Sequence, residues 1–213
     1  MPMNLKPEKA FILRITHISN VPWILEHGLR CATSDVRDPD FRPIGDADLI
    51  QKRAVRAIPA PPHGTISDYV TFYFTPLSPM LYNIKTGYRG IERLPISEIA
   101  IIVSSLPMLA SSGVDFVFTD CHAYLAETQF SSDLADLNRI DWDILCTHDF
   151  QNTIDDQGKM QRYQAEALAR EHVPVAALHG IACHGKAECG RIVEEVGQRG
   201  LDPKVIVRPG WFF

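Results

Sequence analysis

The chain has 213 residues, of which 46% are hydrophobic and 22% charged, as in ordinary globular proteins. No run approaches the roughly 18 apolar residues that a bilayer span requires, and residues 1–10 contain no apolar stretch typical of a secretory signal. The net charge of −5 excludes bulk attraction to nucleic acid, so such a role would need a local basic patch. Five irregularly spaced cysteines indicate a reducing compartment, and we expect a cytoplasmic protein with no membrane contact.

The first part of the chain alternates short apolar runs with proline-rich loops. The predicted elements, in order, are a strand at 11–16, a helix at 21–28, a loop at 31–46, a helix at 46–54, a rigid loop at 58–67 and a strand at 69–74. Ser19 or Asn20 can cap the first helix, and Gly28 can end it. The second helix has acidic residues in its first turn and basic residues in its last, which suits the helix dipole.

The second part continues the same pattern. The predicted elements are a helix or turn at 80–85, a strand at 98–104, a helix at 106–112, a strand at 116–119, a helix at 131–137, a polar loop at 149–159, a strand at 175–183, a helix at 187–199 and a strand at 204–208. Many short strands with irregularly inserted helices favour a compact α+β domain over alternating βαβ units. We expect a single domain over residues 1–213.

One acidic residue draws attention within residues 161–168, QRYQAEAL. Glu166 has aromatic, amide and small neighbours, and a buried carboxylate is costly unless it is paired or used. It is therefore a candidate for chemistry. The alternative is that Glu166 lies on the exposed face of a helix.

Several familiar sites are missing. The sequence contains no dinucleotide-binding glycine motif, phosphate loop, zincin helix or nucleophile elbow. His179, Cys183, His184 and Cys189 contain metal-binding side chains, but their spacing does not match standard zinc ligands, and we expect no metal. His122, just past a predicted strand, is placed to contact a ligand or to serve as a structural histidine.

Six blocks of sequence carry a resemblance that runs in order along nearly the whole chain. They are residues 14–20 (RITHISN), 49–54 (LIQKRA), 68–81 (DYVTFYFTPLSPML), 116–123 (FVFTDCHA), 162–166 (RYQAE) and 210–213 (GWFF). With these blocks, the chain resembles the DarT family of DNA ADP-ribosyltransferase toxins.

The resemblance implies an ADP-ribosyltransferase fold, with two facing, mostly antiparallel β-sheets and inserted helices around an NAD cleft. It implies transfer of ADP-ribose from NAD, as co-substrate, to a base of single-stranded DNA, usually thymine, with release of nicotinamide. It also implies a partner, a DarG-like antitoxin whose macrodomain removes the modification.

The resemblance further assigns roles to residues. Glu166 and Arg53 would be catalytic, with Arg56 as the alternative arginine because Ala54 and Val55 depart from the family pattern. The residues expected to bind NAD are Arg14, Ile15, Thr16, His17, Trp23, Ile50, Tyr73 and Met80. Those expected to bind DNA are His122, Arg162, Tyr163 and Arg56, and residues 35–56 would close over NAD.

Two alternatives remain open. The same fold could modify RNA or protein, since fold does not fix the acceptor. The chain could instead be a non-catalytic nucleic-acid- or zinc-binding module built on residues 179–189.

Overall fold

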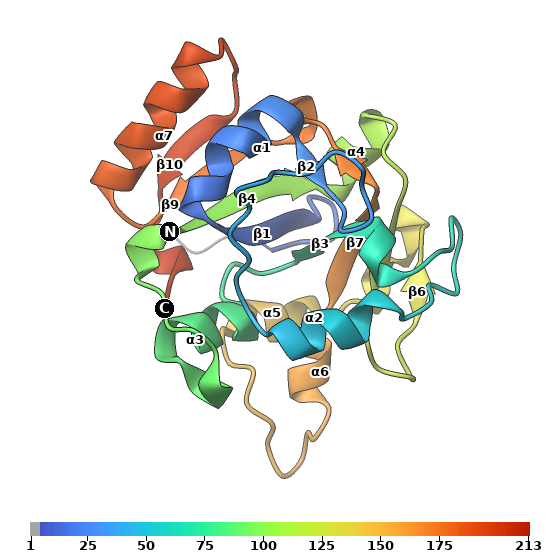
Figure 1. Ribbon diagram of the computed structural model, residues 1–213. Helices are drawn as coiled ribbons and strands as arrows, with labels where there is room; N and C mark the ends of the chain where they lie inside the picture. Colours follow the sequence, from blue (N-terminus) through green and yellow to red (C-terminus); the bar gives the residue numbers. More distant parts are fainter. Residues whose placement is uncertain (1–4) are drawn as a thin grey trace.

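A computed structural model describes residues 5–213, so residues 1–4 of the N-terminal segment considered above lie outside it. The chain forms an eight-stranded sheet of order β10-β9-β4-β1-β3-β7-β5-β6 and a separate two-stranded sheet, β2-β8 (Figure 1). The strands are β1 (Phe11–His17), β2 (Leu29–Arg30), β3 (Tyr69–Tyr73), β4 (Ile99–Ser105), β5 (Phe116–Thr119), β6 (Phe130–Ser131), β7 (Glu166–Arg170), β8 (His172–Val173), β9 (Gly180–Cys183) and β10 (Lys204–Val207).

The large sheet consists of two four-stranded halves that meet at one residue pair. β1 pairs with β4 along its full length, whereas it pairs with β3 only at Leu13 and Tyr73. β10, β9, β4 and β1 form one half, and β3, β7, β5 and β6 form the other. Among the strand pairs of residues 5–213, only β9–β10 is parallel. The expected mostly antiparallel strands are therefore confirmed, and the two expected sheets are the halves of one eight-stranded sheet, joined at a single residue pair.

The helices begin at recognisable signals. Asp46, Ser78 and Ser105 each accept a backbone N–H from the first turn of the helix that follows, which satisfies a donor that the helix leaves free. The α-helices are α1 (Val21–His27), α2 (Ala47–Ala54), α3 (Pro79–Thr86), α4 (Leu106–Ser111), α5 (Trp142–Thr147), α6 (Lys159–Tyr163) and α7 (Lys186–Gln198).

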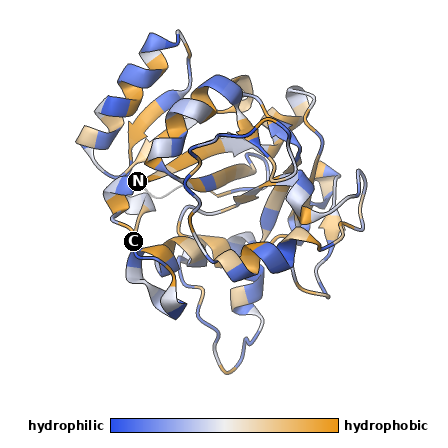
Figure 2. Cartoon of the chain, in the orientation of Figure 1, coloured by the Kyte–Doolittle hydropathy of each residue, from blue (hydrophilic) through white to orange (hydrophobic). Residues whose placement is uncertain are grey.

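The hydrophobic core lies on both faces of the sheet. Every residue of β4 is buried, and alternate residues join different clusters, with Ile102 facing α1 and α7 and Ile101 facing α3. Figure 2 shows the central strands as hydrophobic and α7 as hydrophobic along one side only. In contrast, α2 has no buried residue, because it lies over a cavity rather than on the core.

Some predicted elements differ from the structure. The predicted helix at 131–137 is a 3₁₀ helix at Leu134–Arg139, and the predicted strand at 175–183 divides into a 3₁₀ turn at Val175–Ala177 and β9. The 3₁₀ turn begins directly after Pro174, and the backbone joins the sheet at His179, whose N–H donates to Val103 O at 2.8 Å. Helix α6 and the two-residue strands β2, β6 and β8 were not predicted, because each is too short to show a periodic pattern.

We expect Ile102→Ala to lower the free energy of unfolding by about 2–5 kcal/mol, because it leaves a cavity beneath α1 and α7. Urea denaturation would measure the change. Ile154→Ala, at a side chain that is 93% exposed, is the matched control and should change the free energy by less than about 0.5 kcal/mol. Equal losses in the two variants would show that Ile102 does not anchor this core.

Candidate active site

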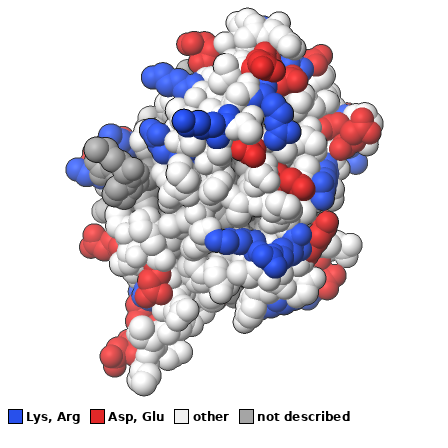
Figure 3. Space-filling view, turned by 90° about the vertical axis from the view of Figure 1, so that its left-hand side faces the viewer, with Lys and Arg blue, Asp and Glu red and all other residues white. Residues whose placement is uncertain are grey.

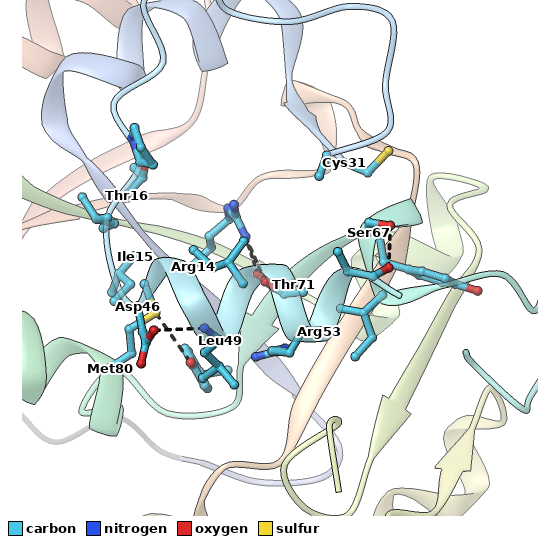
Figure 4. A pocket seen from close by; sticks show the side chains of 18 of the residues that line it. Arg14, Ile15, Thr16, Cys31, Asp46, Leu49, Arg53, Ser67, Thr71 and Met80 are labelled. Carbon is cyan, nitrogen blue, oxygen red and sulfur yellow. Dashed lines mark hydrogen bonds between the residues drawn. The ribbon is translucent and has the colours of Figure 1, made fainter. Parts of the chain in front are cut away.

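A cavity of about 730 Å³ opens where the two halves of the sheet separate. Strands β1 and β3 form its floor, and the loop of residues 31–46, hereafter the covering loop, and α2 lie over it. Figure 4 shows Arg14, Ile15 and Thr16 on β1 and Leu49 and Arg53 on α2 around this space. Seven of the eight residues expected to bind NAD line the cavity, namely Arg14, Ile15, Thr16, Trp23, Ile50, Tyr73 and Met80.

His17 is the exception, and its expected contact with NAD is not supported by the position of its side chain. It is 4% exposed and does not line the cavity. Its Nδ1 lies 2.7 Å from Ser19 Oγ, and its Nε2 lies 3.2 Å from Glu98 Oε2. Both ring nitrogens already have protein partners. His17 therefore holds the end of β1 in place and does not face the cavity.

Glu166 is the first residue of β7 and only 1% exposed, so its placement on an exposed helix face is wrong. It lies opposite Tyr73 across the β3–β7 ladder, beside the junction of the two half-sheets. The Ala123 N–H donates to Oε1 at 3.1 Å, and the Arg53 guanidinium donates to Oε2. This buried carboxylate is therefore paired and oriented from two sides, as a buried charge requires.

Arg53 lies between Glu166 and the cavity. Helix α2 is held at its start by the Asp46 cap and at its end by Ser67 Oγ, which donates to Ala54 O at 2.8 Å. Burial disfavours the charge on Arg53, but the nearby Glu166 carboxylate outweighs burial, so the pKa of Arg53 is raised. The guanidinium is therefore a permanent cation.

Arg56, the alternative partner, is directed elsewhere. Its Nη2 donates to Leu125 O at 2.9 Å, so it contacts the turn at residues 120–128 rather than Glu166. Among the described residues, Arg53 is the arginine that pairs with Glu166, which favours Arg53 over Arg56 as its partner.

Two further side chains on the cavity floor are perturbed by burial. Arg14 donates from Nη1 to Thr71 O at 2.9 Å, and burial lowers its pKa to about 10. Burial, with the Glu166 charge as a second cause, raises the pKa of Tyr73 to about 12. Arg14 therefore stays charged and Tyr73 stays a neutral phenol at neutral pH.

His122 reaches the cavity from the turn at residues 120–128. Tyr124 N–H donates to its Nδ1 at 3.2 Å, and Nδ1 lies 3.9 Å from Glu166 Oε1. Burial lowers the pKa of His122, so the ring is neutral near neutral pH and carries its proton on Nε2. The ring can then donate a hydrogen bond to an acceptor in the cavity, where it is a lining residue.

The expected DNA contacts of the RYQAE block are corrected in part. Tyr163 has no exposed surface, and its hydroxyl donates to Leu77 O at 3.1 Å, so it cannot stack on a base. Arg162 is partly exposed, but it already pairs with Asp156 at 2.7 Å and Asp141 at 3.1 Å. A phosphate would have to compete with these two carboxylates for the Arg162 side chain.

We expect Tyr163→Phe to leave single-stranded DNA affinity within twofold of the wild type, because the ring is sealed inside the core. The variant should lose about 1 kcal/mol of folding free energy with the bond to Leu77 O. Fluorescence anisotropy with a labelled oligonucleotide and urea denaturation would measure the two quantities. A large loss of DNA affinity with unchanged stability would contradict the buried placement.

The residues of the zinc alternative do not converge. His179 Nε2 lies 2.9 Å from Ser105 Oγ, and Cys183 and Cys189 are buried. Within residues 5–213, no group of three or more His, Cys, Asp and Glu side chains is placed to hold a metal ion. No helix in the same range is long and apolar enough to cross a membrane.

Several contributors to the site were not identified from the sequence. The Ala123 N–H holds Glu166 through the backbone, and Tyr124, Gln161 and Gln164 line the cavity. All four lie in or beside the two blocks that contain His122 and Glu166. Nearness to those blocks was the available signal, but a backbone donor has no signature in side-chain chemistry.

The split sheet, the large cavity at its junction and the buried glutamate–arginine pair beside it together define an ADP-ribosyltransferase. A family model described as "ssDNA thymidine ADP-ribosyltransferase, DarT" matches residues 13–213. The chain therefore belongs to the DarT family.

Relatives with known names support this membership. A "DNA ADP-ribosyl transferase" of Escherichia coli O127:H6 is 46% identical over 210 residues, which covers 99% of this chain and 96% of the relative. A "DNA ADP-ribosyl transferase-DNA ADP-ribosyl glycohydrolase fusion protein" of Thermosipho africanus is 24% identical over 202 residues and covers 93% of this chain and 48% of the fusion.

Solved structures give the same fold. Thermus sp. 2.9 DarT in complex with ADP-ribosylated ssDNA matches with a TM-score of 0.89 and 30% identity over 100% of both chains. The same protein in complex with NAD⁺ matches with a TM-score of 0.80 and 31% identity, over 97% of this chain and 99% of the other. The expected ADP-ribosyltransferase fold is confirmed.

Proposed function

We propose that this chain is a toxin enzyme that transfers ADP-ribose from NAD to thymine in single-stranded DNA and releases nicotinamide. It would act as one catalytic domain over residues 1–213. The observation that carries the proposal is the buried Glu166–Arg53 pair at the edge of the cavity, in a chain that belongs to the DarT family. The Thermus relative in complex with ADP-ribosylated ssDNA supports DNA as the acceptor.

The cavity fits NAD as substrate. Its volume of about 730 Å³ falls within the range of about 300–1,000 Å³ that is typical of small-molecule sites. Arginines at positions 14, 30, 37 and 89 line it and can bind a pyrophosphate. Trp23, Ile50 and Met80 supply apolar surface for the rings, and Tyr73 offers a neutral phenol beside the reacting end.

Glu166 would act on the ribose next to nicotinamide. Breaking the nicotinamide–ribose bond develops positive charge at the sugar, as in glycoside hydrolysis. A carboxylate already fixed by Ala123 N–H and Arg53 stabilises that charge without reorganising at the moment of reaction.

Arg53 would stabilise the attacking base. The N3 nitrogen of thymine must lose its proton to attack, and a guanidinium is a poor proton acceptor. Its raised pKa argues further against removal of the proton by Arg53 itself. We assign Arg53 to stabilising the deprotonated base by its positive charge, and the N3 proton would pass to solvent water as the bond from N3 to the ribose forms and the bond to nicotinamide breaks.

Recognition of DNA would come from the turn at residues 120–128 and the neighbouring basic side chains. His122 reaches the cavity with an Nε2–H donor, and Arg56 lies beside the turn. A base in a duplex hides its pairing edge, so the acceptor must be unstacked, which favours a single strand. Figure 3 shows basic and acidic side chains interspersed on one face of the molecule, so a local contact rather than bulk charge would guide the strand.

A DarG-like macrodomain antitoxin is the proposed partner. The Thermosipho africanus relative, whose name joins a DNA ADP-ribosyl transferase to a DNA ADP-ribosyl glycohydrolase, supports pairing with an enzyme that removes the modification.

Labelled NAD and defined oligonucleotides test the proposal. Label should enter thymine-containing single strands, and mass spectrometry should find one ADP-ribose on a thymine. Duplex DNA, RNA and a mixture of proteins serve as parallel acceptors. Label in RNA or protein alone would assign the alternative acceptor, and no label in any acceptor with folded protein would reject an ADP-ribosyltransferase.

A further inference from the structure

The Asn20 side chain joins strand β1 to the middle of the covering loop. Asn20 is 1% exposed, and its Nδ2 donates to Arg42 O at 2.9 Å while its Oδ1 accepts the Arg42 N–H at 2.9 Å. Nδ2 also donates to Thr16 Oγ1 at 3.1 Å. One buried amide therefore holds both backbone groups of a loop residue and a threonine that lines the cavity.

Asn20 lies where a 3₁₀ turn at Ile18–Asn20 continues into α1. Asn20 occupies the N-cap of α1, where an asparagine side chain ordinarily accepts an N–H of the first turn. Here the side chain makes no such bond, although the sequence predicted that Ser19 or Asn20 would cap the helix. The amide is committed to Arg42, 22 residues along the chain, and the helical segment is capped three residues before Asn20, where His17 Nδ1 accepts the Ser19 N–H.

The covering loop has few other ties along its middle. Among the described residues, every hydrogen bond from residues 34–44 to parts of the protein outside the covering loop runs through Arg42. Cys31 and Thr33 tie the start of the loop to Glu171 and Ser67, and Gly45 packs closely on Met80 at its end. Without the contact between Asn20 and Arg42, residues 34–44 would connect these two ends in many conformations, because an exposed loop gains conformational entropy when nothing fixes it.

The Arg42 side chain contributes less to holding the covering loop than the Arg42 backbone does. Its guanidinium lies 2.8 Å from His17 Nε2, 3.3 Å from Glu98 and 3.5 Å from Glu92, but the Arg42 side chain is 42% exposed, and those of Glu98 and Glu92 are 38% and 73% exposed. Exposed ion pairs of this kind are screened and stabilise little. The buried amide bonds to the Arg42 backbone are shielded from water and should dominate.

We propose that Asn20 is a positioning residue that fixes the covering loop over the NAD cavity before substrate binds. The inference rests on the proposed use of NAD. Val36, Phe41 and Ile44 of the loop line the cavity, so a loop already in place presents them without further ordering. A loop that must be ordered during binding lowers affinity, because its conformational entropy is lost at that step.

Asn20→Ala and Arg42→Ala are the paired variants. Asn20→Ala should raise the KM for NAD about tenfold while kcat stays within about threefold, because two hydrogen bonds to the loop are lost and the chemical groups remain. Arg42→Ala keeps the backbone that Asn20 holds and should leave both constants within twofold. A fall in kcat with unchanged KM, or an equal effect of both variants, would overturn the proposal.

Amide hydrogen exchange without any substrate gives a second readout. In the wild type, the Arg42 amide should exchange more slowly than the amides of residues 36–39, and Asn20→Ala should speed its exchange at least tenfold. Fast exchange at Arg42 in the wild type would overturn the proposal even if the variant failed to fold. Because exchange needs no NAD, it separates this inference from the proposed function, which fails if the wild type does not label thymine in single-stranded DNA.

Discussion

Glu166→Gln should reduce transfer of ADP-ribose to single-stranded DNA by about a thousandfold or more, because it removes the charge that stabilises the developing sugar cation. Glutamine keeps the shape of the side chain and an oxygen that can accept the Ala123 N–H. The fold should persist at lower stability, because the uncharged amide leaves the Arg53 guanidinium without its charged partner. Label incorporated per minute at saturating NAD measures the loss, and calorimetric titration with NAD should still detect binding.

The control is Glu194→Gln on α7, an exposed glutamate away from the cavity. It makes the same chemical change and should leave transfer and melting temperature unchanged. Glu166→Gln protein that folds and transfers at the wild-type rate would remove this carboxylate from the mechanism.

Arg53→Ala should lower transfer at least about a hundredfold, since it removes the cation proposed to stabilise the deprotonated base. It also leaves Glu166 without its charged partner, and breaking a buried pair is strongly destabilising, by about 3–5 kcal/mol when burial is complete. Arg53→Lys keeps the positive charge but lacks the planar guanidinium with its paired N–H donors. It should therefore retain more of the wild-type stability than of the wild-type transfer rate. Initial rates and thermal melts of both variants measure these effects.

Lys52→Ala is the matched control, because Lys52 is an exposed basic residue on the same helix. Its transfer rate should match the wild type. Arg56→Ala should weaken activity less than Arg53→Ala, since Arg56 contacts Glu166 only through the turn that carries Leu125 and Ala123. The reverse order of the two arginine variants would return the catalytic role to Arg56.

The sequence predicted most of the long elements because each has a clear pattern or a capping residue. The strand at residues 69–74 and the helices at residues 46–54 and 187–199 were located within a few residues. The elements that it missed are short and depend on tertiary contacts. Helix α6, for example, has five residues and no side-chain cap, and it ends where β7 must begin.

The site was predicted well where residues lie in specific sequence blocks and less well where side-chain direction matters. Glu166 and Arg53 are 113 residues apart, and the resemblance named both, but only the fold shows that they touch. The resemblance assigned Tyr163 to DNA and His17 to NAD. In the structure, Tyr163 is buried, and His17 contacts Ser19 and Glu98 instead of the cavity. Neither the burial nor these contacts can be predicted from the sequence pattern.

The strands of the two half-sheets alternate along the sequence, which affects how the protein folds during translation. The half-sheet of β1 can form only after β4, β9 and β10 have been synthesised, and the half-sheet of β3 only after β5 and β7. Such long-range pairings close late and slowly compared with local ones. A nascent chain that ends before residue 166 contains Arg53 but neither Glu166 nor the strand that carries it. The damaging activity proposed here therefore requires synthesis to have passed β7, so that a fragment released before residue 166 lacks the carboxylate and is inert.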